Sequence, residues 1–389
     1  MRQTPLIYLY ASIFLTALGM ALHTPLLPIY VREVGGSYVD VGVVGAVFAA
    51  PYAFLPIAVG FLSRKVGHLT PYITGVAGCG LSALALLWAD SVQAVVATRV
   101  LGGVAYAFLW PMAEAMIAEM TDWDMRAAAM GMFSLSWGAA FSIGPAAGGF
   151  IAQLLGFKAL FALSSVVIAA ALVLTVFRVR EADGATWATS WRPRLPMRGL
   201  VDVYVAIVAY SASMGLVFVL WPAQAHEAGV VTGVVGLVLA IIGLTRLVVF
   251  AVAGRLSRLG EEQLVVFALL MLSATLAVFG VVTRLLALLL LALLLGIAFG
   301  VLSPMTLTLV SKKIGVGDVG IAMGFAEAMF GLGWVISPLI GGFLLEQFSW
   351  SAPYTLFSLL TAAAALPLAH TIISGGKIYR KGGSGQLFR

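Results

Sequence analysis

Asparagine is absent from this 389-residue sequence, and cysteine occurs only once, at Cys79. A single cysteine excludes a disulfide or a cysteine-based metal site within one chain. The four histidines are scattered, and neither HExxH nor GxSxG occurs, so metal catalysis and intramembrane proteolysis lack visible machinery. The phosphate loop GxxxxGKS/T is also missing, which excludes direct use of ATP. We therefore expect no catalytic residues, no metal and no cofactor.

Charged residues are scarce as well. They make up 10% of the chain, whereas 62% of it is hydrophobic and the mean hydropathy is +1.07. A soluble core of this size cannot bury so many apolar side chains, so lipid must solvate most of them. Apolar runs of about 20 residues, the length that crosses about 30 Å of hydrocarbon, recur from end to end. The sequence predicts an all-α membrane protein with twelve spans, near residues 6–28, 39–60, 70–88, 92–117, 128–151, 157–178, 200–221, 231–253, 262–283, 285–309, 319–343 and 351–373.

The basic residues between these spans fall mainly on one side of the predicted membrane. Seventeen lie on the side that holds both termini, and only Arg32, Lys158 and Arg284 lie in the opposite loops. Cytoplasmic loops of membrane proteins carry an excess of Lys and Arg. We therefore expect a multi-pass plasma-membrane protein with both termini in the cytoplasm. The net charge of +6 then reflects topology and does not indicate a nucleic-acid partner.

The sequence also repeats itself at an offset of 193 to 194 residues. Residues 131–157 align with 324–350 without a gap, and GFLSR from Gly60 aligns with GRLSR from Gly254. One six-helix unit is therefore repeated in parallel, which predicts two pseudo-symmetric six-helix bundles. We expect a basic linker on the inner membrane surface and a disordered cytoplasmic tail. The predicted units are a first bundle at 1–178, the linker at 179–199, a second bundle at 200–373 and the tail at 374–389.

Glycine and proline form recurring patterns inside the predicted spans. The fifth span contains GPxxGG, which recurs in the other half as SPxxGG. Proline bends a membrane helix, and glycines four residues apart let a neighbouring helix approach closely. The patterns predict helix contacts at which one bundle moves on the other, with static packing as the alternative. The residues concerned are Gly144, Pro145, Gly148 and Gly149 in the fifth span, and Pro25 and Pro28 in the first.

These motifs together resemble the major facilitator superfamily, and within it the twelve-helix proton-coupled drug antiporters. The resemblance covers nearly the whole chain. Gly60 and Gly67 are similar to the superfamily's loop signature, although Arg64 replaces its usual aspartate, and Arg99 resembles an arginine linked to proton coupling. The resemblance implies transport by alternating access. It also implies conformational roles for Pro25, Pro28, Gly60, Arg64, Gly67, Gly144, Pro145, Gly148 and Gly149.

Charges deep inside a membrane span are costly and are candidates for function, and Arg99, Glu327 and Arg246 stand out among the ionisable residues of the predicted spans. Counting 1.5 Å per residue places Arg99 near the midplane, and Glu327 and Arg246 at matching depths. Glu327 and Arg246 could therefore pair, either as a proton-coupling pair or as a static structural ion pair. Glu114 lies nearer the inner side. We predict proton coupling through Glu327, Arg246, Arg99 and Glu114.

Aromatic and polar residues in the spans indicate a pocket for a substrate. Tyr106, Trp110 and Glu114 follow one another at spacings of four, which places them on one helix face. The alternative is an interfacial belt of Trp and Tyr near the helix ends. We predict that the substrate-binding residues are Tyr30, Tyr106, Trp110, Trp137, Gln224 and Trp334.

The predicted function is secondary active transport of a small molecule, and two forms of it remain open. The first is proton-coupled efflux of a small apolar or cationic compound, as the resemblance implies. The second is proton-coupled symport or exchange of an anionic metabolite or sugar bound by Arg99 and Arg246, since guanidinium groups bind carboxylates and phosphates. The expected partners are the substrate, protons and the lipid bilayer, and we expect a monomer.

Overall fold

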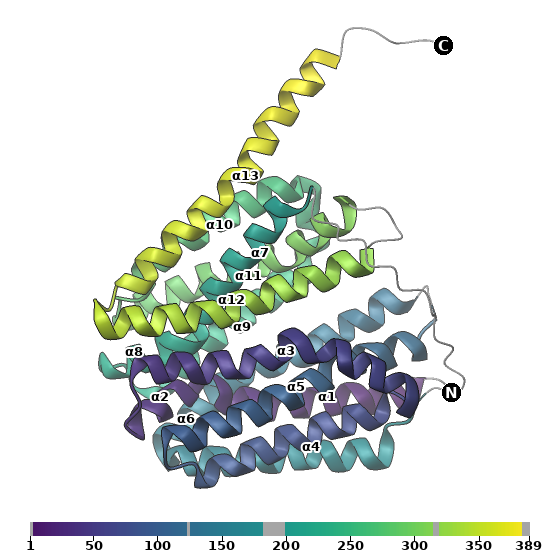
Figure 1. The fold of residues 1–389 in the computed structure, drawn as a ribbon, viewed down its shortest axis with the longest axis vertical. Helices are drawn as coiled ribbons and strands as arrows, with labels where there is room; N and C mark the ends of the chain where they lie inside the picture. Colours follow the sequence, from purple (N-terminus) through teal and green to yellow (C-terminus); the bar gives the residue numbers. More distant parts are fainter. Residues whose placement is uncertain (1–2, 123–124, 182–198, 314–318, 383–389) are drawn as a thin grey trace.

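The computed structural model describes residues 3–122, 125–181, 199–313 and 319–382 (Figure 1). Its described elements are helices. In the first half they are α1 (Gln3–His23), α2 (Leu27–Glu33), α3 (Tyr38–Val66), α4 (Leu69–Ala85), α5 (Val92–Met120) and α6 (Arg126–Arg178). In the second half they are α7 (Val201–Gly215), α8 (Trp221–Glu227), α9 (Thr232–Leu256), α10 (Glu261–Phe279), α11 (Leu285–Lys313), α12 (Val319–Gln347) and α13 (Ala352–Gly382).

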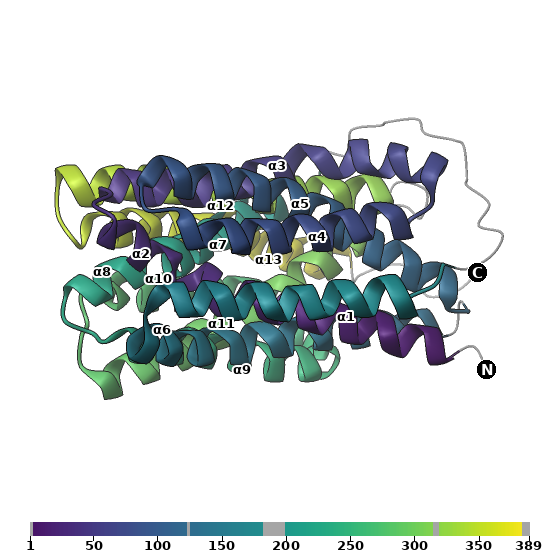
Figure 2. The same cartoon turned by 90° about the horizontal axis from the view of Figure 1, so that it is seen from below.

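The helices run roughly alongside one another between two ends of the molecule (Figure 2). We call the end at which α1 begins and α13 ends the terminal end, and the opposite one the distal end. Much of the predicted linker, residues 182–198, lies outside the described residues. The tail predicted from residue 374 is in part helical, because α13 continues to Gly382. The proposed unit boundaries otherwise remain predictions.

Helix α6 is two spans joined by a reversal of the chain at Gly156. This residue has φ +81°, a left-handed conformation that favours glycine. Contacts with α1 show the reversal. Ile168 lies beside Gly19, whereas Thr175 bonds to Ser12, so the second part of α6 runs antiparallel to α1. Eleven helices in the described chain are long and apolar enough to cross a membrane. The reversal within α6 brings the number of crossings to twelve, as the sequence predicts.

Proline interrupts the first helix of each half. In the first half, Pro25 lies in the short 3-10 turn η1 (Thr24–Leu26), and Pro28 lies in the first turn of α2. In the second half, the π-helical turn η4 (Leu216–Leu220) precedes Pro222 in the first turn of α8. Proline fits a first turn because that turn's N–H groups have no partner within the helix. Each interrupted pair, α1 with α2 and α7 with α8, therefore forms one bent span.

The internal repeat is visible in hydrogen bonds as well as in sequence. The Tyr10 hydroxyl donates to the Ala129 carbonyl over 3.0 Å, which ties α1 to α6. The Tyr204 hydroxyl donates to the Ala322 carbonyl over 3.2 Å, which ties α7 to α12 in the same way. Donors and acceptors are related by the offsets found in the sequence. The two halves are therefore pseudo-symmetric six-helix bundles.

Two glycine seams join the halves. Gly42 of α3 packs directly on the backbone of Pro338 in α12, and Gly236 of α9 packs in the same way on Pro145 in α6. Any Cβ at either glycine would overlap the opposite carbonyl. These two contacts are repeat mates. The seams therefore place α3 against α12 and α6 against α9, as Figure 1 shows for α3 and α12.

The terminal end is packed differently. A Cβ built at Gly60, Gly131, Gly254 or Gly324 would meet nothing within 4 Å. These four glycines lie in the terminal part of α3, α6, α9 and α12, the helices that form the seams. At the distal end the same helices pack with their backbones in direct contact, α3 on α12 and α6 on α9. The structure is therefore closed at the distal end and unpacked at the terminal end.

Candidate functional site

Two carboxylates, one from each half, lie between the halves towards the terminal end. Glu114 is on α5 and Glu327 is on α12, and both residues are exposed. They interact electrostatically with each other, and both interact with Tyr52 of α3. A shared neighbour and a mutual interaction mean that both face the interface and not the lipid. Within the described part of the chain, neither carboxylate has an ion-pair partner.

A group of aromatic rings from the first half adjoins these carboxylates. The Tyr52 and Tyr106 ring centroids are 5.4 Å apart, Tyr106 and Trp110 are also 5.4 Å apart, and Trp110 and Phe133 are 5.9 Å apart. The rings meet edge to face, which is a favourable geometry for aromatic pairs. Trp110 is only 6% exposed, so it is a buried member of the group. The predicted helix stripe of Tyr106, Trp110 and Glu114 is thus brought together.

The second half supplies a matching group of rings. Trp334 lies 6.3 Å from Phe330 and stacks on Phe218 at 6.2 Å, and Tyr210 lies 5.8 Å from Phe330. The buried Trp334 Nε1 has no hydrogen-bond partner among the described residues. An N–H in such a position could donate to a ligand between the halves.

Arg246 bridges the halves, but not through Glu327. Its guanidinium lies 5.6 Å from the Trp137 ring of the first half and 5.0 Å from the Phe250 ring on its own helix. No ion pair joins it to Glu327 in the described chain, so the expected pair does not form in this structure. Tyr210 interacts electrostatically with both residues. Helix α9 directs Arg246 towards α6, with which it packs closely.

Arg99 is enclosed within the first half. It is 5% exposed, and its guanidinium lies 3.8 Å above the Phe48 ring. Its Nε has no hydrogen-bond partner among the described residues, and it interacts electrostatically with Cys79 and Tyr106. Tyr106 belongs to the aromatic group beside the carboxylates, and stacking on Phe48 covers one face of the Arg99 guanidinium.

Tyr30 is placed apart from the aromatic groups. It is 4% exposed at the distal end, where its hydroxyl donates to the Ala89 carbonyl over 3.0 Å. The neighbouring Lys158 hydrogen-bonds to Asp90, which lowers the pKa of that carboxyl. Tyr30 thus fixes the loop between α4 and α5. The expectation that Tyr30 binds substrate stays a prediction, and its hydroxyl already has a partner in this structure.

Gln224, the repeat mate of Tyr30, has a similar structural role. Its Nε2 donates to the carbonyls of Gly280 and Trp350, each over 3.0 Å, and its Oε1 accepts from Tyr354 over 2.6 Å. The side chain is 1% exposed, and both of its polar atoms are satisfied. Gln224 therefore ties two distal loops of the second half together. Its predicted role in binding substrate stays a prediction.

Replacing Gln224 by leucine is expected to destabilise the protein without changing substrate affinity. The change leaves buried acceptors unsatisfied, and each such group costs about 1–3 kcal/mol. Thermal unfolding should show a lower melting temperature, and ligand titration should show an unaltered dissociation constant. Gln263→Leu is the matched control, because Gln263 is exposed on α10. A weaker ligand affinity with unchanged stability would contradict this prediction and indicate that Gln224 binds the substrate.

The GPxxGG glycines divide between two kinds of contact. Gly144 and Gly148 pack on the α1 backbone at Ala21 and Leu22, within the first half. Gly149 faces the second half, where a Cβ would lie 2.7 Å from the Thr232 carbonyl oxygen. The motif therefore both builds the first bundle and forms part of a seam.

The residues of the predicted loop signature lie at the terminal end. Gly67 ends α3 with φ +78°, and Gly60 has open space beside it. The side chain of Arg64 lies outside the described residues. The Arg64 backbone lies near the end of α3, beyond the apolar part of that span.

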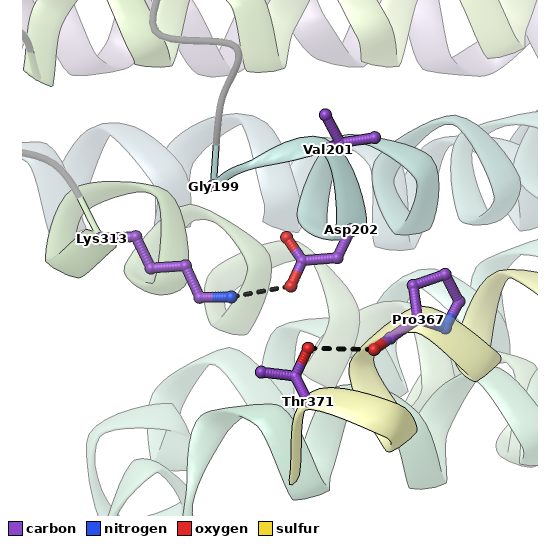
Figure 3. Close-up of a pocket in the computed structure, with 6 residues that line it drawn as sticks. All are labelled: Gly199, Val201, Asp202, Lys313, Pro367 and Thr371. Atoms are coloured by element: carbon purple, nitrogen blue, oxygen red, sulfur yellow. Dashed lines mark hydrogen bonds and ion pairs between the residues drawn. The ribbon is translucent and has the colours of Figure 1, made fainter. Parts of the chain in front are cut away.

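A surface pocket at the terminal end is formed by α7, α11 and α13 (Figure 3). Its charged groups are paired: Lys313 Nζ lies 2.8 Å from Asp202 and 3.2 Å from Glu262. The Thr371 hydroxyl donates to the Pro367 carbonyl over 3.0 Å. Paired charges of this kind tie helix ends together, so the pocket has no evident role in binding a ligand.

Two repeated six-helix bundles, closed at one end and with polar groups between them, define a membrane transporter of the alternating-access type. The family model of the Major Facilitator Superfamily matches residues 9–200 and 203–380. The chain belongs to that superfamily, and it is not an enzyme.

Curated relatives cover most of this chain at low identity. Multidrug resistance protein 2 of Bacillus subtilis is 27% identical over 363 residues, which cover 89% of this chain and 90% of that protein. The multi-drug resistance efflux pump PmrA of Streptococcus pneumoniae is 25% identical over 376 residues, which cover 91% and 92%. Multidrug resistance protein MdtG of Escherichia coli is 26% identical over 381 residues.

Solved structures confirm the fold. The nucleoside transporter NupG matches with a TM-score of 0.81 at 13% identity, covering 94% of this chain and 99% of that one. A peptide transporter, POT in complex with sulfate, matches with a TM-score of 0.79 at 15% identity, covering 96% and 95%. At such identities the likeness concerns the fold and not the substrate.

Proposed function

We propose that this protein exports a small apolar or cationic compound in exchange for protons. The observation that carries the proposal is the pair Glu114 and Glu327, which face one interface from opposite halves without an ion-pair partner in the described chain. A carboxylate that is free of arginine or lysine can exchange a proton or bind a cation. The surrounding rings would bind the apolar part of a substrate or interact with its positive charge.

The position of the two carboxylates gives a mechanism for coupling. Closing the terminal end brings α5 and α12 closer together, and with them two negative charges. Two unit charges at about 4 Å repel by about 4 kcal/mol at an effective dielectric constant near 20. A proton or a cation on either group removes that repulsion. The empty, deprotonated protein would therefore be hindered from closing, as an exchanger requires.

The relatives support the same proposal. Multidrug resistance protein 2, PmrA and MdtG are named as multidrug resistance proteins or efflux pumps. They align over about nine tenths of both chains, so the likeness includes both halves and the interface between them. At about 25% identity they indicate a class of function and leave the substrate to experiment.

Transport by the purified protein in vesicles tests the proposal. A lipophilic cation such as ethidium should accumulate against its gradient when a pH gradient is imposed, and each transport event should move protons in the opposite direction. Dissipating the pH gradient with an ionophore should stop accumulation. Accumulation that ignores the pH gradient would contradict proton coupling.

A second candidate is exchange or symport of an anion, and Arg246 favours it. Its guanidinium has no carboxylate partner in the described chain, and its Nε is unpaired there. Arg99 gives less support than the sequence suggests, because it is covered by Phe48. A screen for ligand-induced thermal stabilisation separates the two candidates, because a ligand that binds only the folded state raises its melting temperature. Stabilisation by anions that is lost in Arg246→Ala would favour the second candidate.

We also propose that the terminal end faces the cytoplasm, because the basic residues are concentrated there. After replacement of Cys79 by alanine, single cysteines at Arg258 on the terminal side and Val281 on the distal side test this orientation. Both positions are exposed. In intact cells an impermeant thiol reagent should label Val281→Cys and not Arg258→Cys. Labelling in the opposite pattern would invert the topology.

A further inference from the structure

Two helices at the distal end have their first N–H groups bonded to the opposite half. The Tyr38 N–H at the start of α3 donates to Glu346 Oε2 of α12 over 2.9 Å. The Gly233 N–H near the start of α9 donates to Gln153 Oε1 of α6, also over 2.9 Å. The first N–H groups of a helix have no acceptor within that helix. Each half therefore caps a helix of the other.

These two caps are related by the internal repeat. Glu346 and Gln153 are repeat mates at an offset of 193 residues, and their acceptor positions lie at matching places on α12 and α6. The donors, at the starts of α3 and α9, match to within one residue. The same cross-half contact is thus built twice, although the two acceptors differ in residue type and charge.

An ion-pair network adds to the cap on α3. Arg32 donates through Nε to Glu227 and through Nη1 to the Gly36 carbonyl over 2.6 Å. Its guanidinium lies 4.4 Å above the Tyr38 ring, and the Tyr38 hydroxyl donates to Glu227 over 2.7 Å. Glu227 belongs to α8, so this network also crosses between the halves.

The network too has a counterpart in the repeat. His226 and Glu227 are the repeat mates of Arg32 and Glu33. Glu33 and His226 interact electrostatically, as Glu227 and Arg32 do, so each half presents one basic and one acidic residue to the other. Because these contacts recur in both halves, they are a repeated feature of the interface and not one chance pairing.

We propose that Arg32, Tyr38, Gln153, Glu227 and Glu346 form a latch that holds the distal end closed and must release before that end opens. An exposed ion pair alone stabilises little, but a carboxylate at a helix N-terminus also interacts with the helix dipole. On release, water replaces each protein acceptor, so the latch opens reversibly. The inference does not depend on the substrate or the coupling ion.

Release need not unravel α3, because that helix has a second cap within its own half. The Ser37 hydroxyl accepts from the Asp40 N–H over 3.1 Å, and the Ser37 N–H donates to Asp40 Oδ2 over 2.8 Å. This reciprocal capping box stays with α3 when Glu346 moves away. The internal cap maintains the helix, and the cross-half cap is free to act as the latch.

Distances between spin labels test the latch in the full-length protein. Labels at Trp88→Cys and Val281→Cys, in a Cys79→Ala background, place one exposed reporter on the distal end of each half. The double variant Glu346→Ala, Gln153→Ala removes both caps. It should raise the ratio of distal-open to distal-closed protein about tenfold, which corresponds to the free energy that a hydrogen bond with a charged acceptor contributes. A distance distribution that stays unchanged overturns the proposal.

Two further variants separate a latch from general damage to the helix end. Asp40→Ala removes a carboxylate cap from the same end of α3 but not across the halves, so it should leave the distance distribution closed. Glu346→Gln keeps an acceptor oxygen and should open the distal end less than Glu346→Ala. If Asp40→Ala opens the distal end as far as Glu346→Ala does, or if Glu346→Gln opens it equally far, the cross-half hydrogen bond is not the latch.

Discussion

Replacing Glu327 by glutamine is expected to abolish proton-driven accumulation of substrate while downhill exchange continues. Glutamine preserves the size and hydrogen-bonding capacity of the side chain but cannot exchange a proton. The variant would also lack one of the two negative charges that repel each other across the interface, so it could close without a proton. In vesicles, uphill transport should fall to the level of protein-free controls, whereas exchange of labelled for unlabelled substrate should remain measurable.

Glu262→Gln provides the matched control for that experiment. It makes the same chemical change at the terminal end, but Glu262 is paired with Lys313 and lies outside the interface between the halves. It should therefore retain uphill transport. Accumulation at the normal rate and with the normal pH profile in Glu327→Gln would remove Glu327 from proton coupling and direct attention to Glu114.

Arg246→Ala tests a contact between the halves and not an ion pair. The guanidinium contacts Trp137 and Phe250, and it does not pair with Glu327. Its removal should therefore alter substrate affinity, or the ease with which the halves move, more than the pH dependence of transport. The sequence indicates a possible pair of Arg246 with Glu327, but matching depths in two helices do not specify the direction in which each side chain points.

The second large effect is expected at adjacent glycines of the GPxxGG motif. Gly149→Leu should stop transport while the protein remains folded, because the new side chain would meet Thr232 and Gly236 of the opposite half and block the seam. Gly148→Leu should instead reduce the yield and melting temperature of the folded protein, because its side chain would meet the Leu22 backbone within the first bundle. Transport assays and thermal unfolding of the two variants distinguish these outcomes.

The repeat provides an independent check on that difference. Gly342, the mate of Gly149, packs on the Tyr38 backbone across the other seam. Gly342→Leu should therefore behave as Gly149→Leu does, with transport lost and folding retained. Normal transport in both seam variants would show that the seams do not need to close during the cycle.

Much of the fold could be predicted because its determinants are local. Apolar runs indicate the spans, Gly156 separates the two parts of α6, and the offset of 193 to 194 residues identifies the two bundles. The cross-half contacts could not be predicted in this way. Glu346 and Gln153 are recognisable as repeat mates, but only the three-dimensional arrangement shows that each bonds to a helix of the other half.

The site was only partly predictable for a related reason. Tyr106 and Trp110 come together because helical spacing places them on one face. Tyr30 and Gln224 have the residue types of a binding pocket, yet they lie where loops converge, and nearby carbonyls satisfy them. Sequence reasoning identifies polar groups in an apolar span, but it does not reveal which of them already have partners.

The four unpacked glycines at the terminal end imply that the sequence also specifies a second conformation of the two halves. Gly60, Gly131, Gly254 and Gly324 lie within helices, and no neighbouring atom is close enough to exclude a side chain at these positions. Glycine weakens a helix interior, so its presence there needs a reason outside the conformation described. Without side chains at these positions, the helix backbones could pack closely at the terminal end once the distal seams separate. A single sequence would then specify two complementary sets of contacts, only one of which can be made at a time.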